Sequence, residues 1–111
     1  MYNPNNIFAR ILRNEIPAKK VEETTHTLAF HDAFPKAPVH ILVIPKKPYV
    51  TFHDFVCMAD AEEILDFYKT VDAIVRSHDL HHTGYKLQIN TGEGGGQEVP
   101  HFHLHIMGSH R

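Results

Sequence analysis

Cysteine, long apolar runs and excess charge are all scarce in this chain of 111 residues. Its one cysteine, Cys57, excludes an internal disulfide and favours a reducing compartment, where we expect it to be a structural thiol. No apolar run approaches the roughly 20 residues of a membrane span, and residues 1–6 lack the basic and apolar segments of a signal peptide. The formal net charge of −2 gives no reason to expect binding to nucleic acid or an anionic membrane. We therefore expect a soluble, cytoplasmic protein.

The length predicts one domain, residues 1–111, with a core of its own. Two helices are expected. One is short, is capped by Asn5 or Asn6 and ends before Pro17. The other begins at Asp60, which has capping-box spacing to Glu63. Its apolar residues repeat at the helical period and predict core packing: Ile64, Phe67, Tyr68, Val71, Ile74 and Val75.

Alternating or continuous apolar residues predict about five strands. In Tyr85–Thr91, we expect Tyr85, Leu87 and Ile89 on the buried face. The other strands are Val21–Thr24, Thr27–Asp32, Val39–Ile44 and His101–Met107. The segment Val39–Ile44 is apolar on both faces except at His40, which predicts a central strand. We predict an α+β fold on an antiparallel sheet.

The most informative segment is His101–Met107, where three histidines alternate with Phe102, Leu104 and Ile106. Strict alternation places the imidazoles on one strand face and the apolar side chains on the other. Histidine titrates near neutrality, so each ring is a candidate nucleophile, proton donor or metal ligand.

Two other interpretations compete with catalysis. Same-face neighbours on a strand lie about 7 Å apart at the backbone, so three rings of a straight strand converge poorly on one metal ion. A solvated, histidine-rich strand face is the other alternative, since the chain has 11 histidines. Catalysis is favoured, without a metal or another cofactor.

Three neighbouring features add to this interpretation. The loop Gly92–Gln97 lacks the lysine of a P-loop, but its backbone N–H groups directly precede the histidines and suit phosphate oxygens. His40 is a polar residue in an apolar strand and needs a hydrogen-bond partner, which another histidine could be. Asp32 could cap a turn or accept hydrogen bonds from a ribose diol.

Together these segments resemble the histidine triad (HIT) family. The motif His101–Met107 is similar to its His-x-His-x-His signature, and the likeness covers nearly the whole chain. These segments resemble the nucleotide-binding branch, the purine nucleoside phosphoramidases, more than the diadenosine polyphosphate hydrolases or the uridylyltransferases. Further matching segments are Asn6–Phe8, Glu15–Lys19, Leu28–Asp32, Ala37–His40, Leu42–Lys47 and Gly95–Val99.

The resemblance implies a site and an assembly. His103 would be the nucleophile, assisted by His105 with His40 behind it, and His101 completes the catalytic set. Asp32 would bind the ribose. Nucleotide binding would also involve Ile7, Phe8, Ile11, Phe30, His31, Asn90, Gly96, Gln97 and Glu98. Two five-stranded sheets would join into the ten-stranded sheet of a homodimer.

The implied activity is hydrolysis of purine nucleoside 5′-phosphoramidates and mixed AMP anhydrides, with AMP or GMP conjugates as substrates. A dinucleoside polyphosphate hydrolase and a nucleotide-binding interaction module with incidental hydrolysis remain alternatives. Pro100 stands where many relatives have an aromatic residue, and Glu98 replaces a hydroxyl residue of some relatives. We expect Pro100 to alter strand entry, because proline cannot donate to a ladder.

Overall fold

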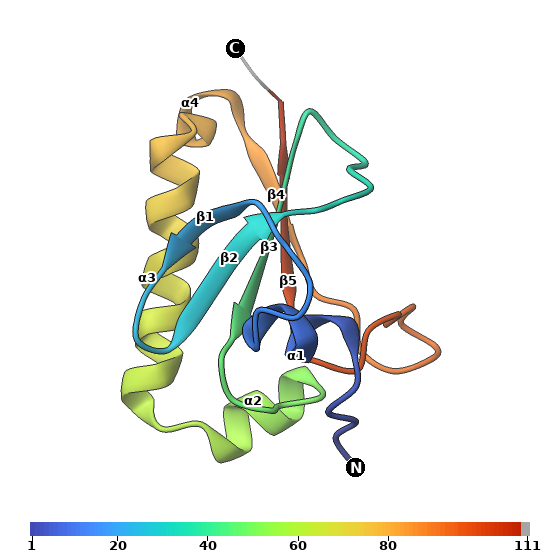
Figure 1. Ribbon diagram of the computed structural model, residues 1–111. Coiled ribbons are helices and arrows are strands. Elements are labelled where there is room, and N and C mark those ends of the chain that lie inside the picture. The colour runs from blue at the N-terminus through green and yellow to red at the C-terminus, as the bar shows by residue number, and fades with distance from the viewer. Residues whose placement is uncertain (110–111) are drawn as a thin grey trace.

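The computed structural model describes residues 1–109. It contains a five-stranded antiparallel sheet in the order β1-β2-β3-β5-β4. Figure 1 shows the long helix α3 on one side of this sheet and the short helix α1 on the other. The α+β prediction is confirmed. The elements are α1 (Ile7–Leu12), β1 (Lys20–Glu23), β2 (Thr27–His31), β3 (Val39–Pro45), α2 (Phe52–Met58), α3 (Ala61–Ser77), α4 (Leu80–Thr83), β4 (Tyr85–Gln88) and β5 (Leu104–Gly108).

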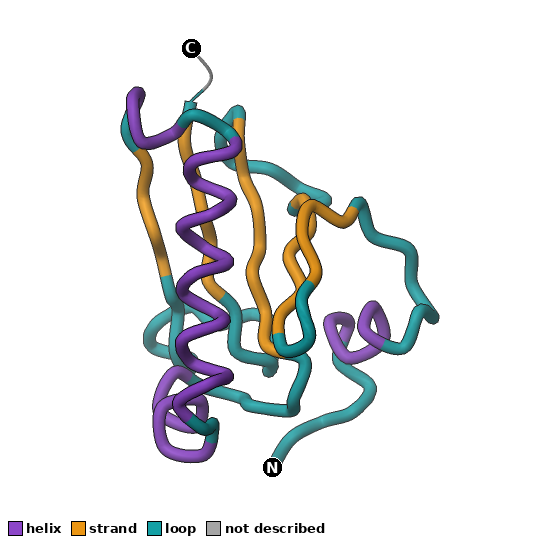
Figure 2. Tube along the Cα trace, turned by 90° about the vertical axis from the view of Figure 1, so that its left-hand side faces the viewer, coloured by secondary structure: helices purple, strands orange, loops and turns teal. Residues whose placement is uncertain are grey.

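The central strand β3 is buried along its whole length, because a helix covers each face of the sheet. On one face α3 packs against alternate residues of β3 and β5, and Figure 2 shows it running along the strands. On the other face, Phe8 and Ile11 of α1 pack against Leu28, Phe30 and Leu42. The second face is only partly covered, so a cavity opens beside α1.

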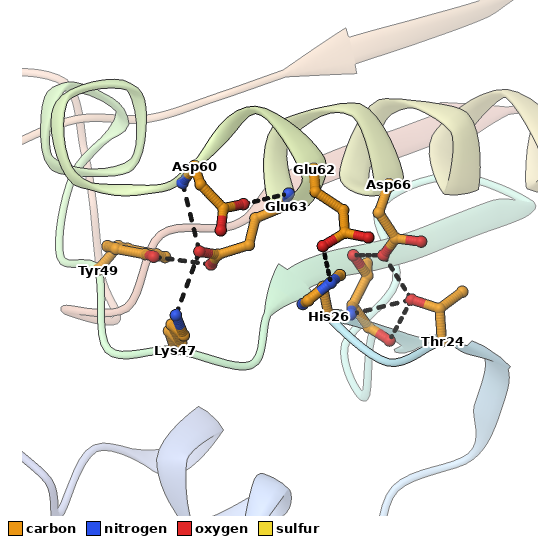
Figure 3. Close-up of polar contacts among 9 residues, drawn as sticks. Thr24, His26, Lys47, Tyr49, Asp60, Glu62, Glu63 and Asp66 are labelled. Atoms are coloured by element: carbon orange, nitrogen blue, oxygen red, sulfur yellow. Dashed lines mark hydrogen bonds and ion pairs between the residues drawn. The ribbon is translucent and has the colours of Figure 1, made fainter.

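Polar contacts hold the start of α3 against the sheet (Figure 3). Asp60 and Glu63 form the predicted capping box, which satisfies N–H groups that the helix leaves unpaired. Glu63 also accepts hydrogen bonds from Tyr49 at 2.7 Å and Lys47 at 3.3 Å. Burial opposes ionisation of Glu63, but these donors lower its pKa below 4.5. In turn, the Tyr49 carbonyl accepts from the amide of Phe102, which ties this region to the histidine segment.

Several sequence predictions are wrong in detail. The helix α2 was not predicted, although Thr51 and Asp54 form a capping box that the sequence already contains. Cys57, on α2, is exposed rather than structural. The segment after α3, where no helix was expected, forms the short helix α4, with Leu80 buried and His81 and His82 exposed.

The last two strands are shorter than predicted. Strand β4 ends at Gln88, and Tyr85 and Leu87 are 46% and 44% exposed because β4 is an edge strand without a cover. Strand β5 begins only at Leu104, so His101 and His103 precede the regular ladder. Pro100 lies just before them and has no N–H for pairing. The alternation itself is confirmed, since Phe102, Leu104 and Ile106 all lie in the core under α3.

Candidate active site

A cavity of about 1140 Å³ lies between α1, β2, the loop of residues 32–38 and the end of the histidine segment. Its lining includes most of the residues singled out in the sequence: Ile7, Phe8, Ile11, Phe30, His31, Asp32, His40, Asn90, Gly96, Glu98, His103 and His105. Two others lie elsewhere. His101 is fully buried behind the cavity. The side chain of Gln97 bonds the amide of Gly92 and the carbonyl of Val50.

The ring of His103 is oriented by the protein backbone. Its Nδ1 lies 2.7 Å from the carbonyl oxygen of His101, which can only accept, so Nδ1 carries the proton. Burial lowers the pKa of His103 below 6.5, and the ring is therefore neutral at pH 7. A neutral ring protonated at Nδ1 has a free electron pair at Nε2. His103 is thus prepared to act as a nucleophile.

The ring of His105 has the opposite arrangement. The amide of Lys36 donates to Nδ1 of His40 at 3.0 Å, so neutral His40 carries its proton on Nε2. That Nε2 lies 2.9 Å from Nδ1 of His105 and donates to it, which leaves the proton of neutral His105 on its own Nε2. Burial, with the neighbouring His103 second, lowers the pKa of His105 to about 4. His103 therefore offers an electron pair where His105 offers a proton, with ring centroids 5.1 Å apart.

Asp32 contacts both the loop after β2 and this chain of histidines. One carboxylate oxygen accepts from the amide of Phe34 at 2.8 Å, which is the turn-capping contact anticipated as an alternative. The other oxygen lies 3.4 Å from Nε2 of His40. Its side chain remains 19% exposed, and Asp32 lines the cavity, so lone pairs remain for a ligand.

Donor atoms of Asp32, His40 and His105 lie within 4.8 Å of one another, a spacing that a metal ion could exploit. A cation there would displace the proton that His40 shares with His105. It would thereby remove the hydrogen bond that places a proton on the outer nitrogen of His105.

Two contacts that orient the histidines were not anticipated. Lys36 acts through its backbone N–H, which no side-chain pattern reveals. Tyr2 donates from its hydroxyl to Nδ1 of His101 at 2.7 Å, across 99 positions of sequence. Such a contact between distant segments has no signal in local periodicity.

The glycine-rich loop reaches the cavity with a constrained backbone. Gly96 lines the cavity and has a φ of +77°, which favours glycine. A Cβ at Gly95 would collide with the backbone of Thr91, so this position also requires glycine. Asn90 donates to the Gly95 carbonyl at 2.7 Å, and Gln97 donates to that of Val50 at 2.6 Å. Asn90 and Gln97 thus hold the loop in place at the cavity rim.

This α+β fold, with two histidines of one strand segment lining a cavity, is the arrangement typical of a HIT domain. The chain belongs to the HIT domain family, whose sequence profile matches residues 13–111. It is 51% identical to an uncharacterized 13.2 kDa HIT-like protein of Azospirillum brasilense over 99% of this chain and 90% of that one.

Solved structures agree with this assignment. A HIT family hydrolase of Legionella pneumophila superposes with a TM-score of 0.88 at 40% identity, covering 96% of this chain and 95% of the other. A histidine triad nucleotide-binding protein of Candida albicans gives a TM-score of 0.86 at 28% identity, over 96% and 76% of the two chains. In the part of the chain that the structure describes, no helix is long and apolar enough to cross a membrane.

Proposed function

We propose that this protein is a metal-independent hydrolase of purine nucleoside 5′-phosphoramidates and related mixed anhydrides of AMP. The observation that carries the proposal is the pairing of a free Nε2 electron pair on His103 with an Nε2 proton on His105 at one cavity. Two proteins of similar structure, a HIT family hydrolase and a histidine triad nucleotide-binding protein, support the same class.

In the proposed reaction, Nε2 of His103 attacks phosphorus and forms a nucleotidyl-histidine. The bound phosphoryl anion stabilises the imidazolium form of His105, which takes up a second proton from solvent. The imidazolium then transfers its Nε2 proton to the leaving nitrogen. The phosphorus–nitrogen bond breaks with its electron pair on the amine. Water next attacks phosphorus and gives a proton to Nε2 of His105, the phosphorus–nitrogen bond to His103 breaks with its electron pair on Nε2, and the nucleoside monophosphate leaves. The carbonyl of His101 stabilises the positive charge that develops on the His103 ring.

The remaining cavity residues suit the nucleotide. Ile7, Phe8, Ile11 and Phe30 offer an apolar surface to a purine, without side-chain hydrogen bonds that would distinguish adenine from guanine. Asp32 offers acceptors to the ribose hydroxyls. The N–H groups of Gly95, Gly96 and Gln97 donate to carbonyls of their own loop, so the loop shapes the cavity at Gly96 and does not offer these donors to the phosphate.

The proposal includes a homodimer in which two sheets join into one of ten strands. Its support is the edge strand β4, which is hydrogen-bonded on one side by β5 and exposes Tyr85 and Leu87. An apolar, unpaired edge is the usual site of strand-to-strand association.

The decisive experiment compares turnover of adenosine 5′-phosphoramidate and diadenosine polyphosphates by the purified protein. We expect faster hydrolysis of the phosphoramidate, an adenylylated protein by intact mass after rapid quenching, and no effect of chelator. His103→Ala should lose several orders of magnitude in kcat and the adduct, while the matched variant His82→Ala, at an exposed histidine, keeps both.

The other possible outcomes of this experiment would support a different function or mechanism. Preferential cleavage of diadenosine polyphosphates would assign the polyphosphate hydrolase activity instead. Tight nucleotide binding without turnover of either substrate would assign a binding module. Near-normal turnover by His103→Ala would exclude the covalent mechanism.

A further inference from the structure

His101 is the member of the histidine motif that does not reach the cavity. It is 0% exposed, and its ring contacts Phe8 at a centroid distance of 6.4 Å. Its contribution to the site passes through its backbone carbonyl, which accepts the Nδ1 proton of His103 at 2.7 Å. The orientation of the His103 ring therefore depends on where residue 101 is held.

Both ring nitrogens of His101 have defined partners. Nε2 donates to the carbonyl of Pro45 at 2.8 Å, at the end of β3. Nδ1 of the neutral ring is thus an acceptor, and the hydroxyl of Tyr2 donates to it at 2.7 Å. The two rings also meet edge to face, with centroids 5.6 Å apart. Without the hydroxyl, a fully buried acceptor would lose its partner.

The segment that carries Tyr2 is itself attached to α1. Arg13 donates to the carbonyl of Pro4 at 2.8 Å, and the Asn6 side chain donates to that of Asn3 at 2.7 Å. Asn6 also caps α1 through the amide of Ala9. The first turn of that helix places Phe8 against both His101 and His103, with centroid distances of 6.4 and 5.0 Å. The N-terminal segment and α1 thus support the histidine pair from one side.

We propose that Tyr2 is a positioning residue for the nucleophile, acting through the ring and backbone of His101. The inference rests on the proposed covalent function of His103. As Nε2 of His103 bonds to phosphorus, its ring becomes positively charged, and the hydrogen bond from Nδ1 to the His101 carbonyl strengthens. A displaced His101 would weaken that bond more in the transition state than in the bound substrate. The effect of Tyr2 therefore falls on kcat rather than on nucleotide affinity.

The test is Tyr2→Phe in the full-length protein, which keeps the aromatic ring and removes only the hydroxyl. We expect kcat for adenosine 5′-phosphoramidate to fall about tenfold, with KM and the affinity for AMP unchanged. Tyr68→Phe, at a half-exposed tyrosine of α3 that lies outside the cavity lining, is the matched control and should keep wild-type kcat. Nitrogen-15 NMR of the imidazoles supplies a readout independent of turnover, since the Nδ1 resonance of His101 should move in Tyr2→Phe alone.

The outcomes separate this inference from the proposed function. Wild-type kcat in Tyr2→Phe, alongside an inactive His103→Ala, would overturn the role of Tyr2 and leave the enzyme assignment intact. A parallel loss of kcat, AMP affinity and melting temperature would also overturn it, because it would indicate a general structural role. If the wild-type protein hydrolyses neither substrate, the proposed function fails on its own, and an unchanged His101 resonance would then disprove the contact itself.

Discussion

At the scale of single residues, the two cavity-facing rings of the histidine motif differ only in their hydrogen-bond partners. A backbone carbonyl holds a proton on the inner nitrogen of His103, whereas a backbone amide, acting through His40, removes it from the inner nitrogen of His105. The sequence was sufficient to predict that the histidines of this motif are candidates for catalysis. The opposite proton positions could not be predicted, because they depend on the Lys36 amide and the His101 carbonyl, whose places are fixed only by the folded loops.

Asp32 provides the residue-scale test of nucleotide recognition. If its carboxylate binds the ribose diol, Asp32→Asn should weaken AMP binding by about 1.5–3 kcal/mol, the range for hydrogen bonds to charged groups. It should also reduce the preference for AMP over 2′-deoxy-AMP. Calorimetric titration in a His103→Ala background measures both without turnover.

Glu98→Gln is the control for this measurement, because Glu98 is a second acidic residue of the same cavity lining. Its neutralisation should leave AMP binding unchanged or strengthen it, since a carboxylate near the phosphate repels the ligand. Equal affinity of the wild-type protein for AMP and 2′-deoxy-AMP would remove Asp32 from the ribose site.

At the scale of helices and strands, local patterns predicted the elements that are amphipathic or fully buried. The stripe on α3 and the apolar run of β3 were sufficient, because burial on a known side decides their composition. Tyr68 is the exception: it was expected in the core but is 38% exposed. The pattern of β4 was misleading. Alternating Tyr85 and Leu87 indicate an apolar strand face, yet nothing within the monomer covers that face. Local periodicity cannot distinguish a face that meets the core from one that meets another chain.

The edge strand β4 therefore carries the prediction on assembly. We expect the wild-type protein to sediment at twice the mass of its 12.7 kDa chain, because pairing of two β4 edges would satisfy backbone groups and bury the exposed face. Leu87→Lys should shift the equilibrium toward monomer, since a charge would be buried at the joint. Val56→Lys, at an exposed apolar residue of α2, should sediment like the wild type. A monomeric wild-type protein at micromolar concentration would contradict the ten-stranded sheet.

At the scale of the whole molecule, burial of histidines links stability to pH. Burial lowers the pKa of His101 and of His105 to about 4, with backbone and neighbouring groups as smaller influences. Burial also lowers the pKa of His40 and His103. In the unfolded chain these rings bind protons near their ordinary pKa of 6.5. Unfolding therefore takes up protons below pH 6.5, and stability falls as the pH decreases toward 4.

We expect the melting temperature to be nearly constant between about pH 7.5 and 9 and to fall by several degrees between about pH 6.5 and 5. In that interval Glu15, Glu23 and Glu63, whose pKa values lie below 4.5, contribute little to the change. His105→Gln should make the dependence shallower, whereas His82→Gln should leave it unchanged, because His82 is exposed. Equal melting temperatures at pH 7.5 and 5 would show that the buried histidines are protonated in the folded protein.

The backbone groups that fix the positions of the histidine protons also determine how the site can change by substitution and how it can be transferred to another protein. Two backbone groups determine which ring is the nucleophile and which is the proton donor. One is the carbonyl in the turn before β5, and the other is the amide in the loop between β2 and β3. Substitutions around the cavity can therefore change the substrate without exchanging nucleophile and donor. Transplanting the three imidazoles alone into another sheet would carry over the side chains but not their proton positions. A functional graft has to include both loops.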